Sequence, residues 1–239
     1  MNDVLGQAIA DFYNQQLCSK LWIHNKYGRK EEMPVTTYFR SAEEMPELEL
    51  IALQHCTGRV LDIGAGAGSH TLELQDKGVD VTALEISEKA AAVMEQRGVK
   101  NIVKQDIFLF EGERSDTLLL LMNGIGLTGN LARLREFLQL AKKLVVQSGI
   151  ILLDSSDVAY LYNDHIPQMD HYYGEIKYRY EYKKQKTEWF TWLYIDQNTL
   201  AKIAGEEGWE LEILWVDEYD QYLAKLTRSL KRQQTKMHD

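Results

Sequence analysis

Cysteine is almost absent from this chain of 239 residues. Its two cysteines, Cys18 and Cys56, lie 38 positions apart, and neither belongs to a C-x-x-C pair. Isolated thiols at this spacing provide neither a disulfide framework nor a zinc site. We therefore interpret both cysteines as small, buried apolar side chains and predict no metal site.

The chain also lacks an excess of basic residues and any long hydrophobic run. It has 27 Lys and Arg against 36 Asp and Glu, a formal net charge of −9, which disfavours nucleic acid as a partner. The longest purely apolar runs, such as residues 118–122, are far too short to span a bilayer. The first residues include Asp3 and Asp11 and lack a basic start followed by an apolar block. We therefore expect no secretory signal and a cytoplasmic protein.

What the chain does have is the composition of a globular protein, with 45% hydrophobic and 26% charged residues. Its length suits one large α/β domain with an added cap. We predict an N-terminal helical cap over residues 1–57 and a main domain over residues 58–239. Apolar residues recur at helical spacing over residues 4–12, and we expect a second helix to start near Ser41 with Pro46 in an early turn.

A glycine-rich loop follows the first strand of the main domain. Residues 60–63 read Val-Leu-Asp-Ile, glycine then occupies positions 64, 66 and 68, and a helical pattern continues from Thr71. A strand, a glycine-rich turn and a helix in this order bring the backbone close to a bound cofactor, because glycine adopts positive φ at little cost and has no side chain. The loop therefore predicts a cofactor site at the end of this strand.

The glycine spacing departs from the dinucleotide fingerprint. G-x-G-x-x-G starting at Gly64 would place glycine or alanine at position 69, where the chain has Ser69. The string Asp62-x-Gly64-x-Gly66-x-Gly68 instead resembles the first motif of the class I S-adenosylmethionine (SAM) dependent methyltransferases. This resemblance implies SAM as the cofactor.

Two further landmarks follow in the family's order and spacing, and the resemblance covers residues 58–154. Residues 81–85 read as a strand ending in Glu85, whose carboxylate can accept hydrogen bonds from both ribose hydroxyls of an adenosine cofactor. Asp106 follows the next short strand, in the position of the family's acid-containing loop beside the adenine. Asp106 and the adjacent Ile107 would therefore meet the adenine.

The resemblance assigns the other motif residues as well. The loop glycines would let the backbone approach the methionine portion of SAM, and Asp62 would bind its amino group through water or orient the loop. Asn123, which follows the apolar strand at 117–122, would face the site where methyl group and acceptor meet, or would only form the turn before Gly124. The implied cofactor-binding residues are Asp62, Gly64, Ala65, Gly66, Gly68, Glu85, Ile86, Asp106, Ile107 and Asn123.

Strand and helix patterns alternate through the domain. They predict an α/β fold with a doubly wound, mostly parallel seven-stranded sheet, the Rossmann-like methyltransferase fold, ending in an antiparallel pair at 209–216 and 220–227. Period-two alternation over 174–182, a polar turn and a second strand over 188–195 predict a hairpin inserted at about residues 157–195.

The inserted segment is rich in aromatic residues: 11 of the chain's 24 lie between residues 160 and 194. One hypothesis is that this segment and the N-terminal helix form a lid over an aromatic or cationic small-molecule acceptor. Alternatively, the aromatic side chains simply pair across the hairpin or make a dimer surface, so the oligomeric state stays open.

Catalytic residues are hard to identify from sequence in this family. Methyl transfer from a sulfonium is an in-line displacement, so the protein mainly aligns the acceptor and excludes water. The candidates are Asn123, Tyr38 and His165, the last as a general base or, with His171, as a metal ligand. His70 is interpreted as a surface or capping residue. The absence of an Asn-Pro-Pro-Tyr string after the fourth strand disfavours a DNA base or a glutamine amide as the acceptor.

The sequence therefore predicts a SAM-dependent methyltransferase that acts on an unidentified small molecule. Two alternatives remain. An NAD(P)-dependent oxidoreductase is disfavoured by Ser69 and by the final two strands. A non-catalytic protein could have kept the SAM pocket as a sensor or scaffold.

Overall fold

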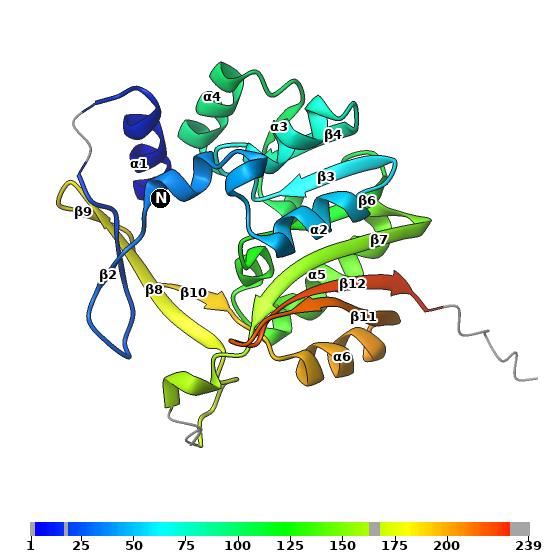
Figure 1. The fold of residues 1–239 in the computed structure, drawn as a ribbon. Coiled ribbons are helices and arrows are strands. Elements are labelled where there is room, and N and C mark those ends of the chain that lie inside the picture. Colours follow the sequence, from blue (N-terminus) through cyan, green and yellow to red (C-terminus); the bar gives the residue numbers. More distant parts are fainter. Residues whose placement is uncertain (1–2, 17–18, 163–167, 230–239) are drawn as a thin grey trace, which may run out of the picture.

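The main sheet has the predicted number of strands and the predicted strand directions. In a computed structural model that describes residues 3–16, 19–162 and 168–229, seven strands form one sheet in the order β11-β12-β7-β6-β3-β4-β5 (Figure 1). Neighbours from β7 to β5 pair in parallel, whereas β12 is antiparallel to both β7 and β11. The predicted doubly wound sheet is confirmed. Its strands are β3 (Arg59–Ile63), β4 (Asp80–Glu85), β5 (Ile102–Lys104), β6 (Ser115–Leu120), β7 (Val145–Ser156), β11 (Trp209–Val216) and β12 (Gln221–Arg228).

Helices cover both faces of this sheet. Helix α5 buries three apolar side chains spaced one turn apart, Leu134, Leu138 and Ala141, in a core cluster that also includes residues of α6. This apolar face packs the helix against the sheet. The opposite face packs against α2, α3 and α4. The helix bounds are α2 (Glu47–His55), α3 (Ser69–Asp76), α4 (Glu88–Arg97), α5 (Leu131–Leu144) and α6 (Gln197–Glu206).

A second, antiparallel sheet lies beside the main one (Figure 1). In the described part of the chain it has five strands in the order β10-β8-β1-β2, with β9 also paired to β8. The predicted hairpin is confirmed as β8 and β10, but the sequence pattern did not predict β1 and β2 within the N-terminal cap. They are two or three residues long; β1 pairs with the distant strand β8, and β2 pairs with β1. The bounds are β1 (Trp22–His24), β2 (Glu31–Glu32), β8 (Glu175–Tyr182), β9 (Gln185–Lys186) and β10 (Phe190–Leu193).

The N-terminal helix α1 (Val4–Tyr13) joins the two sheets. The Asp3 side chain caps it by accepting from the Gly6 N–H, and Val4, Ala8 and Ile9 are buried. The helix packs against α4 on one side and β8 on the other. A Cβ atom at Gly6 would lie 2.1 Å from the Ser87 Oγ, so this glycine permits the close approach of α1 to the start of α4.

The second N-terminal helix differs from the prediction. Residues Ala42–Glu44 form a separate short helix, η2, closed by a capping box between Ser41 and Glu44. Met45 is extended, as expected for the residue before a proline, and Pro46 is the N-cap of α2. Proline therefore separates two helices instead of lying inside one. The other short helices are η1 (Val35–Phe39), η3 (Ile107–Leu109), η4 (Gly124–Thr128) and η5 (Ala159–Tyr162).

Within the described residues, no helix combines the length and apolar character that crossing a bilayer would need.

Candidate cofactor and acceptor site

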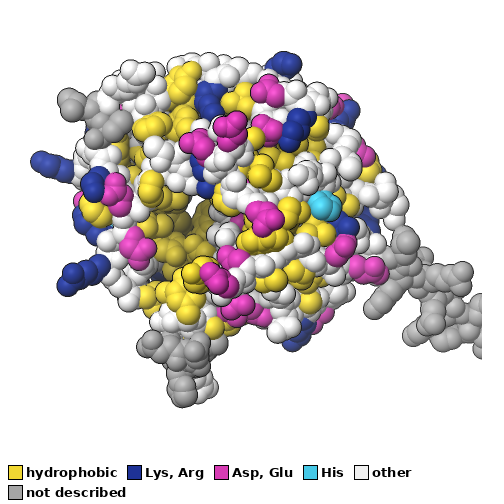
Figure 2. All heavy atoms as spheres, viewed as in Figure 1, with side chains coloured by type: hydrophobic (Ala, Val, Ile, Leu, Met, Phe, Trp, Pro, Cys, Tyr) yellow, Lys and Arg dark blue, Asp and Glu magenta, His cyan; other side chains and the backbone are white. Residues whose placement is uncertain are grey.

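A cavity of about 690 Å³ lies at the carboxyl ends of β3, β4, β5 and β6. This is the edge where ligands bind in open α/β sheets. The second sheet contributes the facing wall, so residues of both sheets line one space. Figure 2 shows it as a hollow with a hydrophobic interior and acidic side chains on the surface beside its opening.

The glycine loop forms the floor of the cavity. Gly64 and Gly66 have φ angles of +77° and +58°, and a Cβ atom on Gly64 would meet no atom within 4 Å. Gly64, Ala65 and Gly66 line the cavity. Gly68 has another role, because a Cβ atom there would lie 2.9 Å from Met94, and its left-handed conformation starts α3. Two of the three predicted glycines thus face the ligand space and the third shapes the turn.

Glu85 ends β4 beside this loop and lines the cavity. Its Oε2 accepts from the Gly66 N–H and its Oε1 from the Ser87 N–H, both at 2.8 Å. Burial raises the pKa of Glu85, and these amides oppose the shift. Each carboxylate oxygen keeps a second lone pair for a ligand hydroxyl. Ile86, 69% exposed, lies at the rim.

Asp106 and Ile107 lie next to Glu85 along the sheet edge, after β5, and both line the cavity. The Asp106 Oδ1 accepts from the Phe108 N–H at 2.9 Å and caps η3, which fixes the loop. The Arg133 guanidinium carbon lies 4.0 Å from the centre of the Phe108 ring. This end of the cavity therefore combines the apolar side chains of Ile107 and Phe108 with the Asp106 carboxylate and the Arg133 guanidinium.

Asp62 supports the loop from below. It is buried, and its Oδ2 accepts from the Thr71 Oγ at 2.6 Å, which ties the end of β3 to the first turn of α3. Burial raises the pKa of Asp62, and neighbouring His70 opposes this shift. Of the two roles predicted for Asp62, the observed bond favours orienting the loop.

Asn123 follows β6 at the boundary between the two sheets. It and Met122 have φ angles of +53° and +61°, a conformation that costs a non-glycine residue about 1–3 kcal/mol. The Asn123 N–H donates to the Asp154 Oδ1 at 2.8 Å, and its carbonyl oxygen accepts from the Trp192 Nε1–H at 3.0 Å. Asn123 forms the predicted turn before Gly124 and also lines the cavity, while its role beside the methyl group and the acceptor stays a prediction.

Tyr38 lies over the glycine loop. A Cβ atom at Gly66 would be 3.1 Å from its ring, and its hydroxyl points at the Met33 sulfur, 3.8 Å away. Burial raises the pKa of Tyr38 well above its ordinary value, so the phenol stays protonated. Tyr38 is therefore suited to packing against a ligand and unsuited to removing a proton.

The predicted role of His165 lies outside the described residues. His171, its proposed partner in metal binding, pairs with Asp170 on the surface. The described residues contain no cluster of three or more side chains able to hold a metal ion. Cys18 lies outside the described residues, whereas Cys56 is half-buried, and burial raises the pKa of its thiol to about 12.

The prediction for His70 is wrong: this side chain is buried and lines the cavity. Its Nε2 lies 2.8 Å from the Glu49 Oε2, and Glu49 is also paired with Arg40. Burial alone would lower the pKa of His70, but the bond to Glu49 and the charge of Asp62 raise it. No local sequence pattern indicates this cluster, because it depends on how α2 packs against α3.

The second sheet supplies what we call the aromatic wall: Tyr178, Tyr180, Phe190, Trp192 and Tyr194. Because side chains alternate along a strand, these residues of β8 and of the β10 segment share one face. Successive rings have centres 5.2–6.5 Å apart. All but Phe190 line the cavity. A Cβ atom at Gly126 would lie 1.9 Å from the Trp192 Nε1, so this glycine makes room for the indole.

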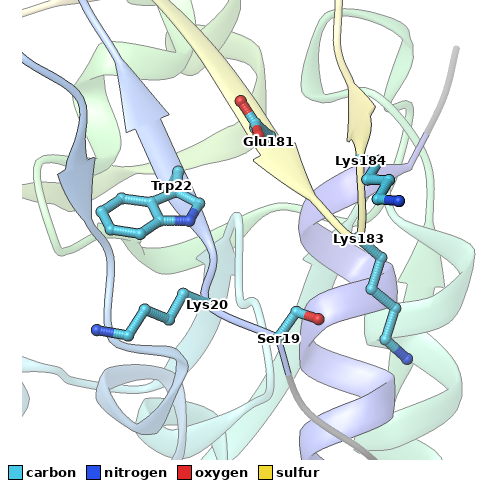
Figure 3. A pocket seen from close by; sticks show the side chains of 6 residues that line it. All are labelled: Ser19, Lys20, Trp22, Glu181, Lys183 and Lys184. Atoms are coloured by element: carbon cyan, nitrogen blue, oxygen red, sulfur yellow. The ribbon is translucent and has the colours of Figure 1, made fainter.

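A second hollow, of about 500 Å³, lies around β1 and the β8–β9 turn (Figure 3). Lys183 pairs with Asp11, Lys20 pairs with Glu32, and Glu181 pairs with lysines from both sides. The positive and negative side chains around this hollow neutralise one another, so we interpret it as solvated surface and not as a catalytic site. The residues that line this hollow are Ser19, Lys20, Trp22, Glu181, Lys183 and Lys184.

Comparison with known proteins agrees with the geometry of the large cavity. A family model described as a methyltransferase domain matches residues 61–153. A solved SAM-dependent methyltransferase from Bacteroides fragilis, in complex with S-adenosyl-L-homocysteine, is 40% identical over 95% of both chains, with a TM-score of 0.87. A search of curated proteins finds no significant match.

More distant solved structures share only the fold. The CcbJ methyltransferase from Streptomyces caelestis is 13% identical over 96% of this chain and all of its own, with a TM-score of 0.63. The sugar N-methyltransferase KedS8 from Streptoalloteichus is 15% identical over 86% of this chain and 97% of its own, with a TM-score of 0.57. From the motifs, the sheet order and the 40% identical relative, the chain belongs to the class I SAM-dependent methyltransferases, whose cofactor is S-adenosylmethionine.

Proposed function

We propose that the chain methylates a small-molecule acceptor bound between the cofactor loops and the aromatic wall. The observation that carries this proposal is the single cavity lined both by Gly64, Glu85 and Asp106 and by Tyr178 and Trp192. A cavity of about 690 Å³ falls within the range of pockets that enclose a small ligand. We therefore infer that cofactor and acceptor share one enclosed space.

The cofactor half fits SAM in shape and chemistry. The open space above Gly64 admits a ligand against the backbone, the Glu85 carboxylate has lone pairs for ribose hydroxyls, and Asp106 with Ile107 forms the adenine end. When bound, SAM supplies a methyl group on a positively charged sulfur. Asp62 holds the loop from beneath, and Ile86 covers the rim.

The protein's own contribution is alignment and exclusion of water. Asp154 and Trp192 hold the backbone of Asn123 from two sides, and its side-chain Oδ1 accepts from the Ser156 Oγ at 3.4 Å. We infer that Asn123 orients the acceptor and that Tyr38 packs over the cofactor. Fixing the reacting atoms in line is a large part of catalysis for a displacement of this kind.

The aromatic wall acts as the lid in this proposal. Its rings line the cavity, and Leu5 of α1 lines the same space, as the lid hypothesis requires. Aromatic pairing across β8 and β10 is also observed, so pairing and lid are compatible. A dimer formed through this hairpin would have to use its other face, because the wall faces inward.

One experiment separates an enzyme from a non-catalytic sensor. The chain is titrated with S-adenosyl-L-homocysteine by calorimetry and then incubated with methyl-labelled SAM and pooled metabolites. Binding with label transfer into a low-mass fraction supports the proposal. Binding with no transfer to any pool favours a sensor or scaffold, and tight NADH binding without SAM binding would contradict the cofactor assignment.

A further inference from the structure

The aromatic wall presents ring faces to the acceptor half of the cavity. Tyr178 and Tyr194 have ring centres 6.3 Å apart and nearly perpendicular, and Tyr180 continues the surface through Phe190. The Tyr180 hydroxyl makes no hydrogen bond within the described residues, so this side chain offers its ring to the cavity without a bond that fixes it elsewhere. Ring faces carry partial negative charge and attract cations.

The charges that line the cavity favour a positively charged ligand. Four carboxylates and two guanidinium groups line it, and Glu49 pairs with both Arg40 and His70. The other three carboxylates, Asp62, Glu85 and Asp106, form no ion pair within the described residues, and Arg133 lies over the Phe108 ring. Acidic side chains also lie beside the opening in Figure 2. The cavity is therefore better suited to a cation than to an anion.

The lining residues also bear on which atom receives the methyl group. A hydroxyl acceptor must lose a proton to a general base, whereas a neutral amine already has a free lone pair. Burial raises the pKa of Tyr178, Tyr180 and Tyr194, so these phenols stay protonated. His70 has its Nε2 on Glu49. The tyrosines of the aromatic wall therefore supply no general base.

Resting on the function proposed above, we propose that the acceptor is an amine and that the ring faces of Tyr178, Tyr180 and Tyr194 hold its nitrogen. The nitrogen lone pair forms the new bond to the methyl carbon as the electron pair of the carbon–sulfur bond returns to sulfur. One positive charge thus passes from sulfur to nitrogen, and the ammonium product then releases any excess proton to water. The wall stabilises the charge at its new position.

The test compares two probes of the same shape, choline and 3,3-dimethylbutan-1-ol, in which carbon replaces the charged nitrogen. Each is titrated into the full chain saturated with S-adenosyl-L-homocysteine, with intrinsic tryptophan fluorescence and calorimetry as readouts. We expect choline to bind at least about tenfold more tightly. Tyr180→Leu should reduce choline affinity about fivefold or more, while the matched Tyr180→Phe, which keeps the ring, should stay within about twofold of wild type.

Each outcome decides a separate question. Equal binding of the two probes, no detectable choline binding, or equal losses in the Leu and Phe variants would overturn the amine proposal. Binding of S-adenosyl-L-homocysteine is measured first in every variant, and it reports both folding and the proposed function. If the wild-type chain does not bind it, the proposed function fails; if it binds and choline is not preferred, only the amine inference fails.

Discussion

The two halves of the cavity are built in opposite ways. The cofactor half comes from the loops that directly follow β3, β4 and β5, and its key groups are backbone atoms and single carboxylates. The acceptor half is a sheet face in which Ile23 of β1 pairs with Tyr180 of β8, 157 positions later. The cofactor half is built from loops that each follow their own strand, whereas the acceptor half depends on pairing between strands far apart in the sequence.

We infer that the cofactor half provides what every SAM-dependent methyl transfer needs, and that the acceptor half provides what one particular acceptor needs. A glycine loop and a ribose-binding acid need only a strand, a turn and a helix, so the cofactor half can be built from short stretches of sequence. The wall needs matching registers of distant strands, and its side chains can change without disturbing the cofactor half. The predictions below test this division from the largest expected effect to the smallest.

The largest effect is expected at Asp154, which joins the halves by accepting from Asn123 and Gln221. Burial raises its pKa from 3.8 to about 6. The stability that this carboxyl contributes is therefore present below about pH 4 and is lost as the pH rises through 6. Between pH 4 and 7 the free energy of unfolding of the wild type should fall by about 3 kcal/mol relative to Asp154→Asn.

Urea unfolding at a series of pH values measures this difference. Asp76→Asn, at the exposed end of α3, controls for the loss of a carboxylate. Parallel curves for the wild type and Asp154→Asn would show that the Asp154 carboxyl titrates alike in the folded and unfolded chain.

Glu85→Ala tests the cofactor half alone. It removes a charged acceptor of ribose hydroxyls, worth about 1.5–3 kcal/mol, so affinity for S-adenosyl-L-homocysteine should fall at least tenfold. Calorimetry measures the dissociation constant, and Glu88→Ala on the exposed first turn of α4 is the control. An unchanged constant would mean that the ribose lies elsewhere.

Gly64→Ala and Gly98→Ala form a matched pair. Both glycines have positive φ, +77° and +94°, and open space where a Cβ atom would go, so both variants should lose about 1–2 kcal/mol of stability. Only Gly64 lines the cavity, and only its variant should bind S-adenosyl-L-homocysteine more weakly, by about tenfold. Equal affinity in the two variants would remove the loop from the cofactor site.

Trp192→Phe should affect the acceptor half while sparing the cofactor half. It removes the hydrogen bond to the Asn123 carbonyl, worth about 1 kcal/mol, so turnover should fall about fivefold with little change in cofactor affinity. Trp189→Phe, at a half-exposed position of the same hairpin, is the control. A parallel loss of cofactor affinity in Trp192→Phe would show that the halves are not separable.

The same division explains what could be predicted from sequence. The alternation of strands and helices, the glycine loop and the positions of Glu85 and Asp106 follow from local patterns, because strand, turn and helix each leave a signal within a few residues. The burial of His70 against Glu49 and the pairing of β1 with β8 leave none, since they depend on tertiary packing. Pro46 did carry a local signal, namely its effect on the residue before it.

The most direct test of the account is a crystal structure of the chain with S-adenosyl-L-homocysteine. The account predicts both ribose hydroxyls within hydrogen-bonding distance of Glu85, the adenine beside Asp106, and the sulfur facing Asn123 and the aromatic wall. A ribose bound away from Glu85, or a sulfur directed away from the wall, would contradict the claim that the two sheets enclose a single site for methyl transfer.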